Sequence, residues 1–280
     1  MTLHVTNGDA VVPELVAAGV DAADVLVWRE VLHDGPVPAG LGPAELARVR
    51  ARHLAGRSWD DEELTEEAAL AMFRERDARL AACPPGEELV LWFEEDLFDW
   101  LLLAQVEDRL AGSAGPVSRV YLRHPPRGDL RAALGAREPV VPDGAAFAAL
   151  RSPDPRAWAG IPGFERLLEE LPDARTGLSR TERQILEALA SGPLAPAELF
   201  VAVAAREDPP WLGDATLFAL ARDLAPLVDG AYALTPAGAD VLAGVATRPP
   251  IDRWIGGVHL GPGHPDWGWN QDTRRPVRLD

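Results

Sequence analysis

Lysine is absent from this chain of 280 residues, and all 27 of its basic residues are arginine. Chemistry that needs a lysine amine is therefore excluded, which covers Schiff-base intermediates, a pyridoxal phosphate (PLP) anchor and the lysine of a nucleotide-binding phosphate loop. The one cysteine, Cys83, cannot form an internal disulfide, and it lies beside Pro84 with no recognisable histidine partner. The sequence therefore gives no support for a thiol nucleophile.

Positive charge is scarce as well. The chain has 44 acidic residues and a formal net charge of −17, and such a surface repels phosphate backbones and anionic membranes. No apolar run approaches the roughly 20 residues that span a bilayer, and the first residues show no secretory signal. We therefore expect a cytoplasmic protein that does not associate with membranes and for which DNA is a disfavoured partner.

Common catalytic and metal-binding motifs are also missing. The chain has no Cys-x-x-Cys or His-Glu-x-x-His spacing, which disfavours zinc. It has neither a Gly-x-Ser-x-Gly elbow nor a Gly-x-Gly-x-x-Gly fingerprint. Candidate site residues must therefore come from the predicted fold.

The first half of the chain alternates short apolar strands with helices. This order predicts an α/β domain over residues 1–142, with three layers and a mostly parallel sheet. Strands are expected at 3–6, 24–28, 89–93, 117–122 and 139–141, and helices at 11–18, 43–55, 60–83, 96–111 and 129–134. Residues 143–177 are rich in proline, alanine, aspartate and arginine and predict a helical linker.

Residues 178–245 predict a winged-helix domain, because three helices, a hairpin and a closing helix follow in that order. Ser179 and Glu182 form a capping box at the first helix, and Asp229-Gly230 is a hairpin turn signal. The stretch 232–238 resembles the end of the wing in many bacterial regulators.

This domain is acidic, which bears on its partner. Residues 178–244 hold four arginines and nine acidic residues, a net charge of −5. The third helix, which would enter a DNA groove, offers only Arg222, whereas a recognition helix needs several contacting side chains. We favour contact with a protein partner or a covering role, and a transcriptional regulator or an interaction scaffold without catalysis is the alternative function.

The tail, residues 246–280, is rich in tryptophan and glycine. A disordered terminus does not carry this composition, so we expect the tail to pack back onto the protein. Arg253 and His259 then complete a site between the domains, or Trp254, Trp267 and Trp269 only seal an interface.

Ligands of open α/β sheets bind beyond the carboxyl ends of the strands. Asn7, Gly8 and Asp9 follow the first strand, where the glycine can expose backbone N–H groups to an anion; Asp9 is either a ligand group or a helix cap. Trp28, Arg29 and Glu30 follow the second strand. Arg29 can clamp a carboxylate or phosphate in bidentate fashion, or it forms a surface pair with Glu30.

Two further groups can move protons. His33 is a general acid or base oriented by Asp34 or Asp9, or a plain turn histidine. Glu94, Glu95 and Asp96 follow the third strand, and such neighbours raise one another's pKa unless a cation balances them. They form a Mg²⁺ site or an acid/base pair, or they are helix N-terminal acids with Asp96 as the N-cap.

Three of these motifs resemble one family. His4–Asp9 (HVTNGD), Trp28–Pro36 (WREVLHDGP) and Leu91–Asp99 (LWFEEDLFD) are together similar to the bacterial domain-of-unknown-function family 1835. The resemblance covers roughly the first 125 residues, and the segment Arg253–Leu260 is also similar to members of that family. It implies no particular activity or substrate.

The chain departs from the family pattern at three positions. Ala10 replaces the usual serine after Gly-Asp, Glu95 stands where histidine is frequent, and Trp100 where glutamine is frequent. Ala10 argues against a serine nucleophile, and Glu95 weakens a metal or general-base role at that position. The resemblance supports the choice of Asn7, Asp9, Arg29, His33, Glu94 and Asp96.

The sequence therefore predicts an α/β domain that binds a small anionic molecule, a nucleotide or a phosphorylated metabolite, with acid/base or Mg²⁺-assisted chemistry. The expected catalytic residues are His33, Asp9, Glu94 and Asp96. The expected ligand-binding residues are Asn7, Gly8, Trp28, Arg29, Glu30, Arg253 and His259.

Overall fold

A five-stranded sheet forms the centre of the first domain. The computed structural model describes residues 2–56, 58–59, 62–113, 115–122, 129–264 and 266–279. The strand order is β2-β1-β5-β6-β7, with the first four strands parallel and β7 antiparallel to β6. The bounds are β1 Thr2–Thr6, β2 Val25–Val27, β5 Glu88–Glu94, β6 Val117–Leu122 and β7 Glu138–Val140. The predicted α/β fold with a mostly parallel sheet is confirmed.

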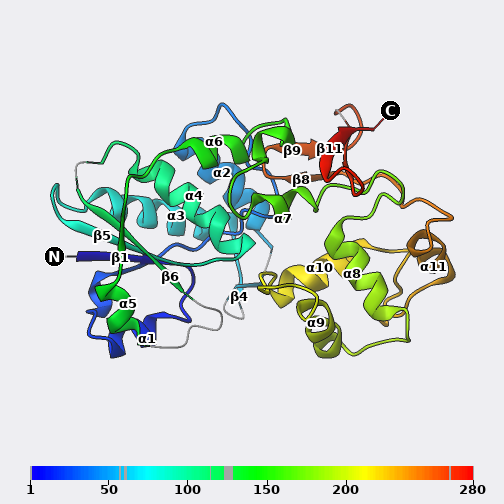
Figure 1. The fold of residues 1–280 in the computed structure, drawn as a ribbon, viewed down its shortest axis with the longest axis horizontal. Coiled ribbons are helices and arrows are strands. Elements are labelled where there is room, and N and C mark those ends of the chain that lie inside the picture. The colour runs from blue at the N-terminus through cyan, green and yellow to red at the C-terminus, as the bar shows by residue number, and fades with distance from the viewer. Residues whose placement is uncertain are drawn as a thin grey trace.

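Helices cover both faces of this sheet (Figure 1). Along β5, Leu91 and Phe93 join one core cluster while Val90 and Trp92 join another, as expected of a strand buried on both faces. The second cluster packs against α1 (Val12–Ala17) and α5 (Leu130–Gly135). The first packs against α4 (Leu97–Leu110), α6 (Ala145–Leu150) and α7 (Phe164–Leu168). Two short 3₁₀ helices, at Ala22–Asp24 and Pro155–Trp158, join these elements.

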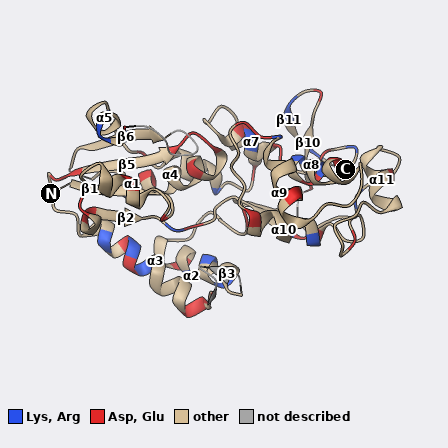
Figure 2. Cartoon of the chain, turned by 90° about the horizontal axis from the view of Figure 1, so that it is seen from below, with Lys and Arg blue, Asp and Glu red and all other residues tan. Residues whose placement is uncertain are grey.

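A helical hairpin of α2 (Pro43–Leu54) and α3 (Glu66–Ala81) lies beside the β2 edge of the sheet (Figure 2). The helix expected over 60–83 was wrong at its start, because β4 (Glu62–Glu63) pairs there with β3 (Ser58–Trp59). Thr65 accepts a hydrogen bond from the Ala68 N–H at 3.1 Å and so begins α3 as its N-cap. Residues 60 and 61 lie outside the described residues.

The second domain has its own apolar core within four helices. These are α8 (Arg180–Leu189), α9 (Pro196–Ala204), α10 (Asp214–Asp223) and α11 (Pro236–Leu242). The predicted capping box is present, with Ser179 and Glu182 exchanging hydrogen bonds. The expected hairpin shrinks to one bridge, Val228 to Leu234. The Asp229 carboxylate accepts the N–H groups of Ala231 and Ala233, which closes the turn locally instead of extending a ladder.

The tail returns to the first domain as two hairpins. They are β8 (Arg253–Ile255) with β9 (Val258–Leu260) and β10 (Trp267–Asn270) with β11 (Arg275–Arg278). Trp267 and Trp269 are buried in the same cluster as Leu3 and Val5 of β1. The tryptophans of the tail therefore complete the core of the α/β domain.

Buried charges join the winged helix to the linker and the tail. Glu170, which precedes α8, pairs with Arg166 at 2.6 Å and accepts hydrogen bonds from Ser179 and Thr181. Burial alone raises the pKa of Glu170, but Arg166 and Arg253 outweigh it and hold that pKa below its usual value. Glu182 of α8 pairs with both Arg248 and Arg253. Removing one partner of such a network leaves an uncompensated buried charge, so the two domains are held in one arrangement.

Candidate functional site

The strand order places a topological switch point between β1 and β5. From β1 the chain continues to β2 on one side, and it later returns to β5 on the other side. Open α/β sheets commonly bind ligands beyond the carboxyl ends of two such strands. Gly8 lies just after β1 with a left-handed φ of 62°, a backbone conformation that glycine adopts readily.

The side chain that bridges this switch point is Asp99 of α4. Its carboxylate accepts a hydrogen bond from the Asn7 amide and another from the Glu94 N–H at 2.5 Å. Asp99 is only 1% exposed, and burial, followed by the charge of Asp96, raises its pKa to about 8. Asn7, Glu94, Asp96 and Asp99 form what we call the strand-end cluster.

Sequence reasoning missed Asp99. Asp96 accepts a hydrogen bond from the Asp99 N–H at 2.9 Å, which makes it the N-cap of α4, so the capping alternative for Asp96 is correct. The sequence does carry one signal for Asp99, because this acid lies between Phe98 and Trp100 in an apolar stretch. Such an acid is buried when its helix packs on the sheet, and buried carboxyls need hydrogen-bond donors.

Arg29 and Asp9 form a pair at the rim of the same edge. The Arg29 guanidinium donates two hydrogen bonds to the Asp9 carboxylate, at 2.6 and 3.0 Å. The expected surface pair of Arg29 with Glu30 and the expected capping role of Asp9 were both wrong, since the N-cap of α1 is Val11. The Arg29 side chain is about one third exposed, and its pair with Asp9 fixes its orientation at the surface.

Trp28 and Glu30 are enclosed and have protein partners. The Trp28 indole N–H donates to the Gln105 side chain at 2.8 Å. Glu30 pairs with Arg50 at 3.1 Å, and both side chains are 1% exposed. Arg50 also donates to the backbone oxygens of Val31 and Asp34. These contacts give Trp28 and Glu30 the role of positioning the loop that carries His33.

His33 lies at a different place, between the two domains. Its ring is 5.4 Å from the Phe98 ring and 5.1 Å from the Trp211 ring, centroid to centroid. Trp211 belongs to the loop between α9 and α10, so the winged-helix domain reaches the loop after β2 here. A cavity of about 350 Å³ opens at this junction, and we call it the inter-domain cavity. Its lining residues are His33, Asp34, Glu170, Glu182, Trp211, Leu212, Thr216, Leu220, Asp223, Arg248, Ile251, Asp252, Arg253, Trp254 and Ile255.

Three buried N–H donors lie in the lining residues of the inter-domain cavity. They are Trp211 Nε1, Arg248 Nη1 and Arg253 Nε, and none has an acceptor among the described residues. The rest of Arg253 is well bonded, with Nη2 donating to the Glu170 backbone oxygen at 2.6 Å. A buried donor without an acceptor costs about 1–3 kcal/mol. All three donors belong to residues that line this cavity.

The predicted site residues therefore fall into separate groups. His259 lies behind the cavity wall, where its Nε2 contacts the Asp252 carboxylate at 2.7 Å and its ring stacks on Trp254 at 4.4 Å. The predicted residues at the carboxyl ends of the strands are Asn7, Gly8, Asp9, Arg29, Glu94 and Asp96. Those that line the inter-domain cavity are His33 and Arg253. Those that support neighbouring residues are Trp28, Glu30 and His259. Phe98, whose ring contacts His33, precedes Asp99 in α4.

The third helix of the second domain, α10, contributes to the inter-domain cavity. Thr216, Leu220 and Asp223 of α10 line this cavity, while Leu217 and Ala221 are buried in the domain's own core. A recognition helix must be free to enter the major groove of DNA. One side of α10 is packed in the core and another borders the cavity.

Several searches gave negative findings. No protein-family model matches the chain, and no curated protein matches it significantly. The resemblance to family 1835 therefore stays a prediction.

Across the described ranges, no three His, Cys, Asp or Glu side chains are arranged to hold a metal ion. In the same part of the chain, no helix has both the length and the apolar character required to cross a membrane.

Proposed function

We propose that this protein binds a small anionic molecule, a nucleotide or a phosphorylated metabolite, in the inter-domain cavity. The observation that carries the proposal is the set of three buried N–H donors on Trp211, Arg248 and Arg253. Carboxylate and phosphate oxygens are the acceptors that such donors bind best. The cavity volume of about 350 Å³ falls in the range of small-molecule sites.

His33 is the residue of this cavity suited to proton transfer, because imidazole nitrogens can donate or accept a proton. Its ring lies against that of Phe98. An imidazole in the lining of the cavity supports acid/base chemistry as the reaction class. The winged-helix domain supplies Trp211 and α10 as a cover.

A thermal-shift panel of nucleotides and phosphorylated metabolites, with and without Mg²⁺, tests this proposal. We expect at least one compound to raise the Tm of the wild-type chain. Trp211→Phe keeps an aromatic ring but removes one N–H donor, and His33→Ala removes the imidazole. Both substitutions are expected to reduce the ligand-induced shift by half or more, because a lost charge-assisted hydrogen bond weakens binding.

Two variants serve as references for this panel. Arg222→Gln alters an exposed arginine of α10 that does not line the cavity and should keep the full shift. Arg29→Ala reports on the strand ends. If Arg29→Ala abolishes the shift while Trp211→Phe and His33→Ala retain it, the ligand binds at the strand ends and the cavity proposal is wrong. The absence of any stabilising compound would contradict the proposal as well.

A further inference from the structure

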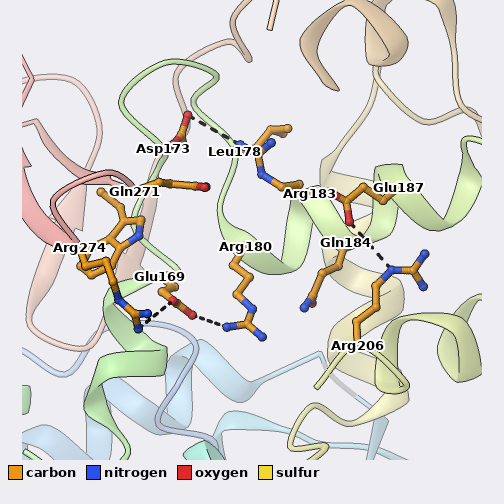
Figure 3. Close-up of a pocket in the computed structure, with 11 residues that line it drawn as sticks. Glu169, Asp173, Leu178, Arg180, Arg183, Gln184, Glu187, Arg206, Gln271 and Arg274 are labelled. Atoms are coloured by element: carbon orange, nitrogen blue, oxygen red, sulfur yellow. Dashed lines mark hydrogen bonds and ion pairs between the residues drawn. The ribbon is translucent and has the colours of Figure 1, made fainter. Parts of the chain in front are cut away.

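A second cavity, of about 470 Å³, lies between the winged-helix domain and the tail. Its wall combines α8 with residues of the linker and with the turn between β10 and β11 (Figure 3). We call it the arginine cavity. It shares no lining residue with the inter-domain cavity. Its lining residues are Glu169, Asp173, Leu178, Arg180, Arg183, Gln184, Glu187, Arg206, Trp269, Gln271 and Arg274.

The charge of the arginine cavity is opposite to that of the chain. Four arginines and three acidic residues line it, whereas the whole chain has a net charge of −17. Four arginines less three acids leave the lining with a formal charge of +1. In Figure 3, Arg180 and Gln184 project from the same side of α8, and Arg206 reaches toward Glu187. The cavity is a locally cationic site on an acidic protein.

Most of the guanidinium groups lack a direct hydrogen bond to a carboxylate. Three of the four arginines form ion pairs at 3.7–4.0 Å, which is beyond hydrogen-bond distance. Arg180 has two closer pairs, at 2.6 Å to Glu169 and 3.2 Å to Glu207. Arg183 donates to the Thr176 hydroxyl, and Arg206 to the Ala202 carbonyl. Since each guanidinium carries five N–H donors, most of them stay available to an anion.

Two buried polar atoms at this wall have no partner among the described residues. They are Arg183 Nε, a donor, and Gln184 Oε1, an acceptor. Gln184 is 94% buried, with 6% of its surface exposed, and its amide nitrogen already donates to Glu207. A ligand that satisfies this wall must therefore offer both an acceptor and a donor. Phosphate alone offers only acceptors when fully ionised.

We propose that the arginine cavity binds a nucleoside polyphosphate. Its phosphates match the arginine donors, which bind such oxygens in bidentate geometry. The hydroxyl or ring N–H groups of its nucleoside supply the donor for Gln184, and Trp269 offers an aromatic wall for the base. Because the arginines come from the winged-helix domain and from the tail, the bound molecule ties these two segments together.

Calorimetric titration of the full chain with ATP tests the proposal. The double substitution Arg183→Gln and Arg206→Gln removes two charges from partly exposed side chains, so the chain is expected to fold. We expect the Kd for ATP to rise at least about tenfold in this variant. Arg222→Gln removes an arginine of the same domain outside the cavity and should leave the Kd within about twofold. Inorganic pyrophosphate, which lacks the nucleoside, should bind the wild type more weakly than ATP.

Other outcomes would overturn this inference. Equal ATP affinity in the double variant and the wild type would remove the arginine cavity as the site. Equal affinity for pyrophosphate and ATP would remove the role of the nucleoside. Trp211→Phe separates the two proposals, because Trp211 lines the inter-domain cavity and does not line the arginine cavity. Loss of ATP binding in Trp211→Phe but not in the double variant would assign ATP to that other cavity.

Discussion

Replacing Arg50 with alanine is expected to lower the free energy of unfolding by about 3–5 kcal/mol. Arg50 and Glu30 are each 1% exposed on their side chains and form an ion pair at 3.1 Å. The substitution leaves the Glu30 carboxylate buried without its counter-charge, and it also removes the donors to the backbone oxygens of Val31 and Asp34. Because these carbonyls flank His33, the variant should also lose ligand-induced stabilisation.

Urea denaturation followed by tryptophan fluorescence measures this effect. Arg52→Ala is the matched control two residues along α2, where the side chain is 75% exposed and lies 3.7 Å from Glu66. Such surface changes cost less than about 0.5 kcal/mol. The combined variant Arg50→Met and Glu30→Gln should recover part of the loss, since it leaves no buried charge. Equal losses for Arg50→Ala and Arg52→Ala would show that the buried pair does not hold this loop.

The second large effect concerns pH. Asp99 has a pKa of about 8 in the folded chain, against about 4 when unfolded. The folded state thus binds the Asp99 proton more tightly than the unfolded state does. The stability that comes from this proton is therefore fully present below about pH 4 and is lost as the pH rises to 8. Each pH unit in this window costs about 1.4 kcal/mol, which over roughly four units amounts to a loss on the order of 6 kcal/mol. Asp99→Asn cannot ionise, and its stability should change much less across the window.

Unfolding midpoints in urea between pH 5 and pH 8.5 check this expectation. Glu95→Gln is the control, because Glu95 is an exposed neighbour that makes no part of the strand-end cluster. Asp96→Asn keeps a capping oxygen but removes the charge that raises the pKa of Asp99, so it should move the upper end of the window to lower pH. If Asp99→Asn and the wild type lose stability in parallel, another group is responsible for the pH dependence.

Sequence patterns predicted the helices and strands of this fold better than they predicted which side chains contact one another. The apolar run 89–93 identified β5, and the capping box of Ser179 and Glu182 identified α8, because both signals are local. The Asn7–Asp99 contact joins residues 92 positions apart, and only the assembled sheet brings them together. The partner of Glu30 is also distant in the sequence. The adjacent Arg29 pairs with Asp9, and the Glu30 carboxylate pairs with Arg50 instead.

The sequence predicts a site between the domains from Arg253 and His259, but it does not predict the lining of the inter-domain cavity. His33, Trp211 and Arg253 come from the loop after β2, the α9–α10 loop and the tail. Periodicity and capping describe one element at a time, so they do not reveal how three distant segments meet. Charged and titratable residues next to turns and glycines, such as His33 and Arg253, are visible in the sequence, whereas Trp211 carries no such signal.

The burial of Trp267 and Trp269 in the same core cluster as Leu3 and Val5 also has a consequence for synthesis. A ribosome makes the strands of the sheet first, then the whole winged-helix domain, and only afterwards the two tryptophans that finish the first core. The winged-helix domain, whose core is separate, can fold while the sheet is still missing part of its packing. During that interval an apolar face of the nascent α/β domain stays open to chaperones, so the last-made segment determines when the first-made domain becomes stable.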